Sequence, residues 1–424
     1  MFRVTTFPNG LRIATAEMPH MTSVSLGLWV GVGSRYETPA LNGVCHFIEH
    51  MLFKGTKKRS AREISEAVEG IGGSLNAFTS EEATCFHARA THDRFESLLE
   101  VLIDMRHGSL FTPADIVKER EVIKEEMAMY CDEPQHLVQE LLNATMWPDH
   151  PLGRSITGTN MTLDRMHREQ LTGYLGENYC TGGSLIVAAG KISHHRVVQA
   201  VKPHMKCWPA GPRPNFAPAI SRQTAPRLRL VTRKTEQTQM ALGVRTCSRH
   251  DPRRFAARLL NTILGENMSS RLFQVVREDH GLTYSIYSTP SFFEDTGDIV
   301  ISAGLEAEKL PRTLRLIFAE LRRLAAHPLG KSDLRRAQDY VLGQINLSLE
   351  STESQMNWLG EQLLGYARTF SPALVKQRIL TVTGRDIQNA ARDFFRPERL
   401  SLALVSPLKT DRQLRRLLNS ACEQ

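Results

Sequence analysis

A proline-rich segment near the midpoint of the sequence most strongly constrains how the chain can fold. Six of its 20 prolines lie between Pro203 and Pro226, in a stretch with little apolar periodicity, as is typical of a connection between domains. At 424 residues the chain is also longer than most single domains. We therefore expect two domains, at residues 1–202 and 227–424, joined by a linker at residues 203–226.

The sequence on the two sides of this linker follows a similar pattern. Residues 24–30 and 239–244 both alternate apolar residues with small or polar ones, and each run leads to a Ser-Arg pair, at residues 34–35 and 248–249. The two pairs are 214 positions apart. This offset favours an internal duplication over two unrelated α/β domains that share a strand–helix rhythm.

Strand-like runs alternate with amphipathic helical patterns in each half. Ser60 and Thr112 are good helix starts, because each hydroxyl can cap a first turn that carries a carboxylate three residues on. We expect an α+β fold of two homologous halves, each a mostly antiparallel sheet packed with helices. The helical stretch at residues 333–368 is expected to pack in the second half.

Composition excludes several classes of protein. Hydrophobic residues make up 41% and charged residues 23% of the chain, as in globular proteins, and no apolar run reaches the roughly 18 residues of a membrane span. The first residues show no signal-peptide pattern, so we expect a cytoplasmic protein, or a periplasmic one if a signal has been removed. Seven scattered cysteines predict reduced thiols.

The net charge of +8 is unevenly distributed. Residues 1–212 carry a net charge of −3 and residues 213–424 a net charge of +11. The excess consists of isolated arginines on helical patterns, without a dense basic stripe interleaved with aromatic residues. We therefore expect no nucleic-acid partner.

One motif carries metal chemistry. Residues 43–53 have helical spacing, and within them His46 and His50 lie four apart, so both imidazoles project from one face and can bind one Zn²⁺. Glu49 lies beside them and can act as a general base on metal-bound water. The motif alone is a moderate signal, since a catalytic zinc site needs a third protein ligand.

The helix that Thr112 opens offers carboxylates for this third position. Glu119 and Glu126 lie seven residues apart on one face, whereas Glu121 and Glu125 point in other directions. Without the histidine motif, such a run would indicate a solvated charged face. With the motif, a metal-binding role is favoured, and Glu126 is preferred to Glu125.

The motif and several further segments resemble the pitrilysin and mitochondrial processing peptidase family of zinc metallopeptidases, the inverzincins. The likeness extends over most of the chain, and the chain length is similar to the short, bacterial-type branch of that family. The similar segments are His46–Thr56, followed 76 residues after His50 by Glu126, then Asn76–Thr79, His150–Gly153, Ile156–Thr159 and Met268–Phe273.

The resemblance implies roles for residues of the first half. It implies His46, His50 and Glu126 as zinc ligands, Glu49 as the catalytic base, and Glu119 as a carboxylate that supports the ligands. A carboxylate of this kind orients a metal ligand and raises its basicity.

The second half carries apolar residues where the first has ligands. At the duplication offset, His46, Glu49 and His50 fall against Leu260, Ile263 and Leu264, which cannot bind a metal. The family's Arg-Tyr pair matches Arg277 and Tyr284, and the resemblance implies that this pair acts on the substrate in catalysis. By residue type alone, both are ordinary surface or packing residues.

A short strand predicted at residues 74–79 is a candidate for peptide capture. An open strand edge can pair with an extended peptide through main-chain hydrogen bonds. The resemblance places this edge beside the zinc, so Asn76, Ala77 and Phe78 are candidates for substrate binding. The alternative is a strand that is paired on both sides inside the sheet.

These observations predict a zinc-dependent endopeptidase with one Zn²⁺ per chain. Its substrate would be a peptide or an unfolded precursor segment, captured as an extended strand in a closed chamber. The resemblance implies a homodimer, or a heterodimer with an inactive homologue. The alternative is a non-catalytic structural or peptide-binding subunit of a larger complex, although such family members usually lose ligands.

Overall fold

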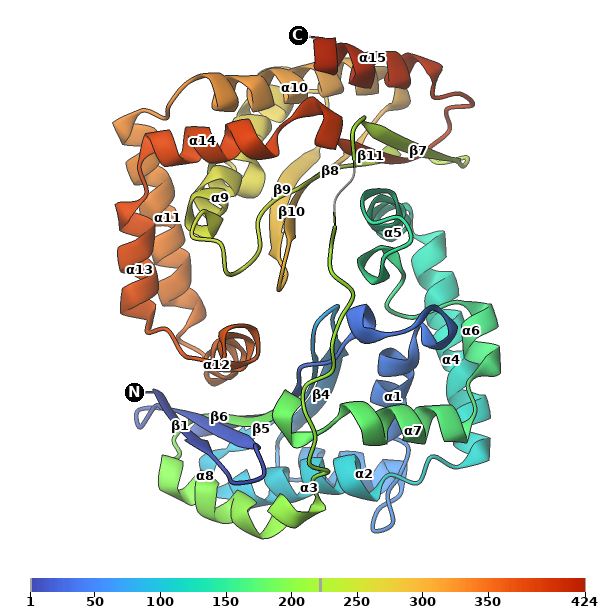
Figure 1. Ribbon diagram of the computed structural model, residues 1–424, viewed down its shortest axis with the longest axis vertical. Helices are drawn as coiled ribbons and strands as arrows, with labels where there is room; N and C mark the ends of the chain where they lie inside the picture. Colours follow the sequence, from blue (N-terminus) through green and yellow to red (C-terminus); the bar gives the residue numbers. More distant parts are fainter. Residues whose placement is uncertain (1, 221–222, 424) are drawn as a thin grey trace. The chain divides into compact units, whose positions relative to one another are not determined.

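The computed structural model describes residues 2–220 and 223–423, which form two compact α+β units (Figure 1). Each unit contains one β-sheet with helices packed on it. Neither unit is a continuous stretch of the chain. Unit 1 comprises Met1–Met127, Arg154–Ala217 and Asn346–Ser371, and unit 2 comprises Ala128–Gly153, Pro218–Ile345 and Pro372–Gln424.

Unit 1 contains a six-stranded sheet with the strand order β1-β2-β6-β3-β5-β4. Its pairs are antiparallel except for β2 and β6, which run parallel. The alternating run predicted at residues 24–30 forms the central strand β3. The strands are β1 (Phe2–Thr6), β2 (Arg12–Glu17), β3 (Ser23–Val30), β4 (Ser74–Thr79), β5 (Thr84–Thr91) and β6 (Ser184–Gly190).

Unit 2 contains a five-stranded sheet with the strand order β7-β11-β8-β10-β9, in which β7 and β11 run parallel. Strands β2 to β6 of unit 1 follow the same order, β2-β6-β3-β5-β4, with the parallel pair in the same place. The predicted fold of two similar halves is thus confirmed. The strands are β7 (Arg227–Thr232), β8 (Thr238–Arg245), β9 (Ser285–Phe292), β10 (Gly297–Leu305) and β11 (Ser401–Ser406).

Most helices of each unit cover one face of its sheet and form its larger core. Ser60 and Thr112 cap helices, as predicted. The helices of unit 1 are α1 (Val44–Leu52), α2 (Ala61–Glu69), α3 (Phe95–Gly108), most of α4 (Pro113–Asp132), α6 (Asn160–Arg165), α7 (Arg168–Asn178), α8 (His194–Val201) and α12 (Thr352–Tyr366). Those of unit 2 are α5 (Pro134–Met146), α9 (Arg254–Asn261), α10 (Leu310–Ala326), most of α11 (Lys331–Ser348), α13 (Pro372–Thr381), α14 (Gly384–Phe394) and α15 (Arg412–Glu423).

A helix from the opposite half of the sequence packs on the other face of each sheet. Helix α12 packs on β2, β3 and β6 of unit 1, and α5 packs on β7, β8 and β11 of unit 2. The expectation that residues 333–368 pack in the second half is therefore wrong for α12. Its apolar residues, including Met356 and Leu359, complete a core of unit 1 with Trp29 and Leu185.

Glycines in the central strands permit these exchanged helices to approach closely. A Cβ on Gly27 of β3 would lie 2.5 Å from Met356 Sδ of α12. A Cβ on Gly243 of β8 would lie 2.4 Å from Met146 Sδ of α5. Because real carbon–sulfur contacts are longer, a larger residue at either position would force the methionine side chain to move. The same contact, a methionine over a strand glycine, thus recurs in both units.

Part of the predicted linker is bound to unit 1. Arg213 donates hydrogen bonds to the carbonyl oxygens of Gly31 (3.1 Å) and Leu364 (2.9 Å) and to the Tyr36 hydroxyl (2.7 Å). Residues 221–222, also in the predicted linker, lie outside the described residues. Among the helices described, none is long and apolar enough to cross a membrane. The cysteines with described side chains, Cys45, Cys85, Cys131, Cys180 and Cys247, are free thiols.

Candidate metal centre

Helix α1 carries the predicted motif of His46, Glu49 and His50 and packs against the larger core of unit 1. Its apolar residues are buried and pack on the sheet, whereas His50 and Glu49 are half-buried and His46 is 9% exposed. The four-residue spacing brings the His46 and His50 rings within 4.7 Å, centroid to centroid.

Helix α4 brings a carboxylate to the two imidazoles. Oε2 of Glu126 lies 3.7 Å from Nε2 of His46 and 3.6 Å from Nε2 of His50. One ligand atom from each of the three residues falls within 4.8 Å of the other two. Glu125 and Glu121 are exposed. The structure thus brings together the three residues predicted as ligands.

This donor set fits a zinc ion. Ligand atoms bonded to one Zn²⁺ at ~2.0–2.1 Å in a tetrahedral arrangement lie ~3.3–3.5 Å apart, close to the two separations found here. Two imidazoles and one carboxylate are also a donor set found in catalytic zinc sites, where the fourth position stays open. The three side chains could therefore hold Zn²⁺ with little movement.

Glu119 contacts both His50 and the ammonium group of Lys54. This glutamate is 1% exposed, and its Oε2 lies 3.3 Å from Nδ1 of His50. Its Oε1 forms an ion pair of 2.9 Å with Nζ of Lys54. The carboxylate can thus hold the His50 ring so that Nε2 faces Glu126. Sequence reasoning anticipated the supporting place of Glu119 but assigned no role to Lys54.

Burial and neighbouring charges set the protonation of the two imidazoles. Burial and, to a smaller extent, the neighbouring His50 lower the pKa of His46 to about 4, against the opposing effect of Glu126. Burial also disfavours protonated His50, but the hydrogen bonds with Glu126 and Glu119 outweigh it and raise the pKa of His50. His46 is therefore neutral at pH 7, the form in which imidazole binds a metal.

Glu49 lies beside the imidazoles and contacts the edge strand. Its Oε2 accepts a hydrogen bond of 2.5 Å from the Thr79 hydroxyl, at the end of β4. Burial raises the pKa of Glu49, and the Thr79 hydrogen bond and His50 partly offset this effect. A raised carboxyl pKa, closer to neutrality, suits a group that takes up and returns a proton. Thr79 is a further residue to which sequence reasoning gave no role.

Strand β4 lies at the edge of the sheet in unit 1. It pairs with β5 alone among the described strands, so its other edge is not covered by a strand. Ala77 faces the core beneath α1, Phe78 packs edge-on against Trp29 at 5.5 Å on the opposite face, and Asn76 is exposed. These three candidates for substrate binding therefore lie on an edge strand that ends at the Glu49 contact.

Arg277 and Tyr284 lie together in unit 2. Arg277 belongs to a π-helical turn (Phe273–Glu278), and its guanidinium lies 4.5 Å from the Phe273 ring and 5.0 Å from the Tyr284 ring. Tyr284 is 80% exposed. The structure thus joins the two residues to each other, and their action on a substrate stays a prediction.

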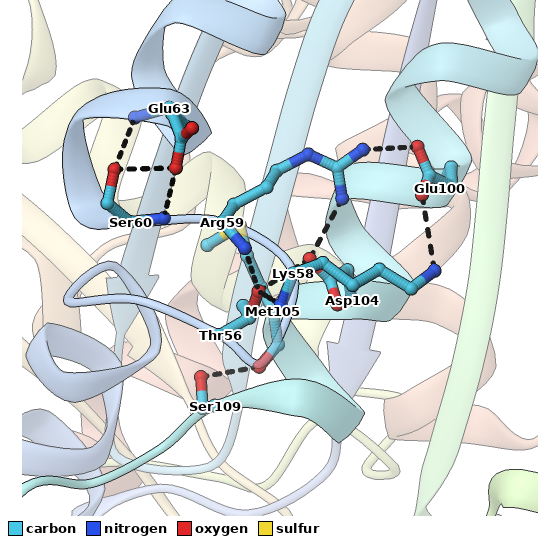
Figure 2. Close-up of polar contacts among 9 residues, drawn as sticks. All are labelled: Thr56, Lys58, Arg59, Ser60, Glu63, Glu100, Asp104, Met105 and Ser109. Atoms are coloured by element: carbon cyan, nitrogen blue, oxygen red, sulfur yellow. Dashed lines mark hydrogen bonds and ion pairs between the residues drawn. The ribbon is translucent and has the colours of Figure 1, made fainter.

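The turn that follows α1 is anchored on α3 (Figure 2). The Thr56 hydroxyl donates to Asp104 (2.7 Å) and accepts from the backbone N–H groups of Lys58 and Arg59. Arg59 pairs with Asp104 (2.9 Å) and Glu100 (2.6 Å). The C-terminal end of the ligand-bearing helix is therefore fixed on a neighbouring helix of the same unit.

The sequence matches known families over most of its length. Residues 12–160 match the family described as Insulinase (Peptidase family M16), and residues 165–341 match the Peptidase M16 inactive domain. An uncharacterized zinc protease of Streptomyces coelicolor is 40% identical over 98% of this chain and 91% of its own. This chain belongs to peptidase family M16. The uncharacterized zinc protease YmxG of Bacillus subtilis is 37% identical over 96% of this chain and 98% of its own.

Two solved structures share the fold of this chain. A protease from Helicobacter pylori matches with a TM-score of 0.89 at 20% identity, over 96% of this chain and 99% of that one. A peptidase M16 inactive domain from Pseudomonas fluorescens matches with a TM-score of 0.89 at 18% identity, over 96% and 98% of the two chains. The family models and the relative of 40% identity confirm the predicted family, and relatives named zinc proteases support a peptidase role for this M16 chain.

Proposed function

We propose that this M16 protein is a zinc-dependent endopeptidase. The observation that carries the proposal is the convergence of His46, His50 and Glu126 at ligand distances from one another. Zn²⁺ bound there would supply a Lewis acid that polarises a peptide carbonyl and lowers the pKa of water from 15.7 to ~7.

The chain's own residues would move the proton. The Glu49 carboxylate would accept the proton of the attacking water and pass it to the leaving amine. The Thr79 hydroxyl holds this carboxylate in place through its hydrogen bond. The Tyr284 hydroxyl is proposed to donate to the developing oxyanion and Arg277 to hold a substrate carbonyl.

The substrate is proposed to be a peptide or an unfolded precursor segment. An extended peptide could pair with the uncovered edge of β4, beside Asn76, Ala77 and Phe78, through main-chain hydrogen bonds that depend little on its sequence. Enclosure of this peptide in a chamber stays a prediction. Assembly as a homodimer, or with an inactive homologue, is likewise proposed, and light scattering of the purified chain would measure it.

The rival proposal is a non-catalytic binding subunit with a vestigial site. The complete ligand set together with Glu49 favours the enzyme, since a subunit without catalysis has no need of a base held beside a metal. The two proposals differ in what they predict for Glu49.

Bound zinc and peptide cleavage decide between them. The wild type is expected to bind one Zn²⁺ and to cut members of a mixed peptide library at internal bonds. Glu49→Gln should retain the metal and lose about 10²- to 10⁴-fold in kcat/KM, because the proton acceptor is gone. Glu125→Gln, which changes an exposed carboxylate of α4, is the matched control and should cleave as the wild type does. Unchanged cleavage by Glu49→Gln would remove Glu49 from the mechanism, and a zinc-loaded wild type without cleavage would favour the binding subunit.

A further inference from the structure

The N-terminal end of α1 is held by a buried carboxylate from outside the helix. Glu37, which is 3% exposed, accepts hydrogen bonds from the backbone N–H groups of Gly43 (2.8 Å) and Cys45 (2.9 Å). It also accepts one from Nδ2 of Asn42 (3.0 Å). The backbone N–H groups of Gly43 and Cys45 have no partner inside the helix, and a negative charge is favoured at a helix N-terminus. Glu37 therefore fixes the first turn of the helix that carries the metal ligands.

The backbone around this turn is tightly confined. Gly43 has a positive φ of 94°, and a Cβ there would lie 2.7 Å from the carbonyl oxygen of Thr157. Nη2 of Arg154 donates to the carbonyl oxygen of Glu37 (2.9 Å). The segment at residues 154–158 thus holds Glu37 and the start of α1 together.

The two imidazoles of the metal centre are oriented in different ways. Nδ1 of His50 faces Glu119 at 3.3 Å, so a hydrogen bond can set that ring. Nδ1 of His46 is buried and has no hydrogen-bond partner among the described residues. The direction of the His46 ring must therefore follow from its packing and from the position of its backbone. Cys45, whose N–H is bound by Glu37, directly precedes His46.

We propose that Glu37 is the positioning residue of His46. By fixing the first turn of α1, it directs Nε2 of His46 toward Glu126, as Glu119 directs Nε2 of His50. Glu37 touches neither the ligand atoms nor a substrate and acts through the backbone. The inference rests on the proposed function in so far as that function places a metal at His46.

The full-length Glu37→Gln variant tests this role. Glutamine keeps the size of the side chain but turns an NH₂ group toward one of the N–H donors. Zn²⁺ affinity, measured by competition with a chelator, is expected to fall about ten- to a hundredfold, as for other residues that orient metal ligands. The visible absorption bands of the Co²⁺-substituted protein should shift, and kcat should fall while KM for a peptide stays unchanged.

Glu320→Gln is the matched control, because it makes the same substitution at another buried glutamate. Glu320 lies in α10 of unit 2, where it pairs with Arg271 and Arg323. This variant should lower the melting temperature but leave the zinc affinity and the Co²⁺ spectrum as in the wild type. The proposal is wrong if Glu37→Gln lowers only the melting temperature, or if both variants change the spectrum equally.

Two further outcomes are covered by separate measurements: a Glu37→Gln variant that does not fold, and a wild type that binds metal but cleaves no peptide. If Glu37→Gln does not fold, Asn42→Ala removes one donor to the same carboxylate and should weaken zinc binding in the same direction by less; an unchanged affinity would contradict the proposal. A wild type that binds Zn²⁺ and Co²⁺ but cleaves no peptide would contradict the proposed function, while the comparison of affinities between variants would still decide the role of Glu37.

Discussion

The helix that follows β3 in unit 1 and the helix that follows β8 in unit 2 take the same place in two sheets of one strand order. In unit 1 this helix is α1 and carries His46 and His50. In unit 2 it is α9, which continues into a π-helical turn (Thr262–Glu266), and Leu260 and Leu264 lie there with no solvent exposure. The same architecture thus supports a metal centre in one copy and a closed apolar core in the other.

The difference shows which residues the fold needs and which the chemistry needs. Both units have a strand glycine beneath a methionine of the exchanged helix, at Gly27 and Gly243, where a larger residue would force that methionine to move. Leucines fill the corresponding places in unit 2, so the architecture itself does not require histidine there. The imidazoles of unit 1 are therefore expected to contribute to metal binding far more than to stability.

Removal of one ligand gives the largest expected effect. His50→Ala should weaken Zn²⁺ binding on the order of a thousandfold, because a three-ligand site loses one of its metal bonds. The melting temperature of the metal-free protein should change little, since His50 is only half-buried. Chelator competition and calorimetry of the metal-free protein measure the two quantities. A large drop in metal-free stability would contradict the division between fold and chemistry.

Substitution of the corresponding residue in unit 2 should lower stability and leave zinc affinity unchanged. Leu264→Ala leaves a cavity in a fully buried position and is expected to lower the free energy of unfolding by about 2–5 kcal/mol. Zinc affinity should stay that of the wild type. Urea unfolding together with the chelator assay tests this, and zinc loss by the folded variant would show that unit 2 also shapes the metal centre.

A smaller effect is expected from acid on unit 1. Burial, together with neighbouring Arg106, lowers the pKa of His107 in α3 to about 4, from an ordinary value of about 6.5. Between these pH values the unfolded chain binds the proton and the folded chain does not, so this contribution to stability is present above pH ~6.5 and is lost as the pH falls toward ~4. His107→Gln should therefore reduce the loss of stability between pH 7 and 4.5 in urea titrations. In the wild type at acid pH, hydrogen exchange should show that unit 1 opens before unit 2. If the wild type and His107→Gln lose equal stability between pH 7 and 4.5, His107 is excluded as the cause.

Local patterns made part of the metal centre predictable. His46, Glu49 and His50 stand within one short helix, and the seven-residue spacing of Glu119 and Glu126 places both on one face of α4. Glu37 escaped prediction because it acts on α1 from a turn several residues upstream, and no periodic pattern marks such a contact.

The fold was predictable to a similar extent. The alternation of residues 24–30 and 239–244, together with the Ser-Arg pair that follows each run at an offset of 214, predicted a duplicated architecture with a sheet in each half. The exchange of α5 and α12 was not, because it depends on contacts such as Met356 with Gly27, which are 329 residues apart and look like any helix and strand in the sequence. The predicted boundaries at residues 202 and 227 follow the proline-rich segment, whereas both compact units draw on segments from each side of it.

The exchanged helices also bear on how the chain is synthesised. The face of the unit 1 sheet that α12 covers cannot be closed until Tyr366 has left the ribosome, well after all six strands of that sheet have been made. Trp29 and Leu185 on this face would meanwhile lie open to water and to other nascent chains. In a chain truncated within the proline-rich segment, α12 is missing and this face of the sheet would stay exposed permanently. We therefore expect such fragments to aggregate.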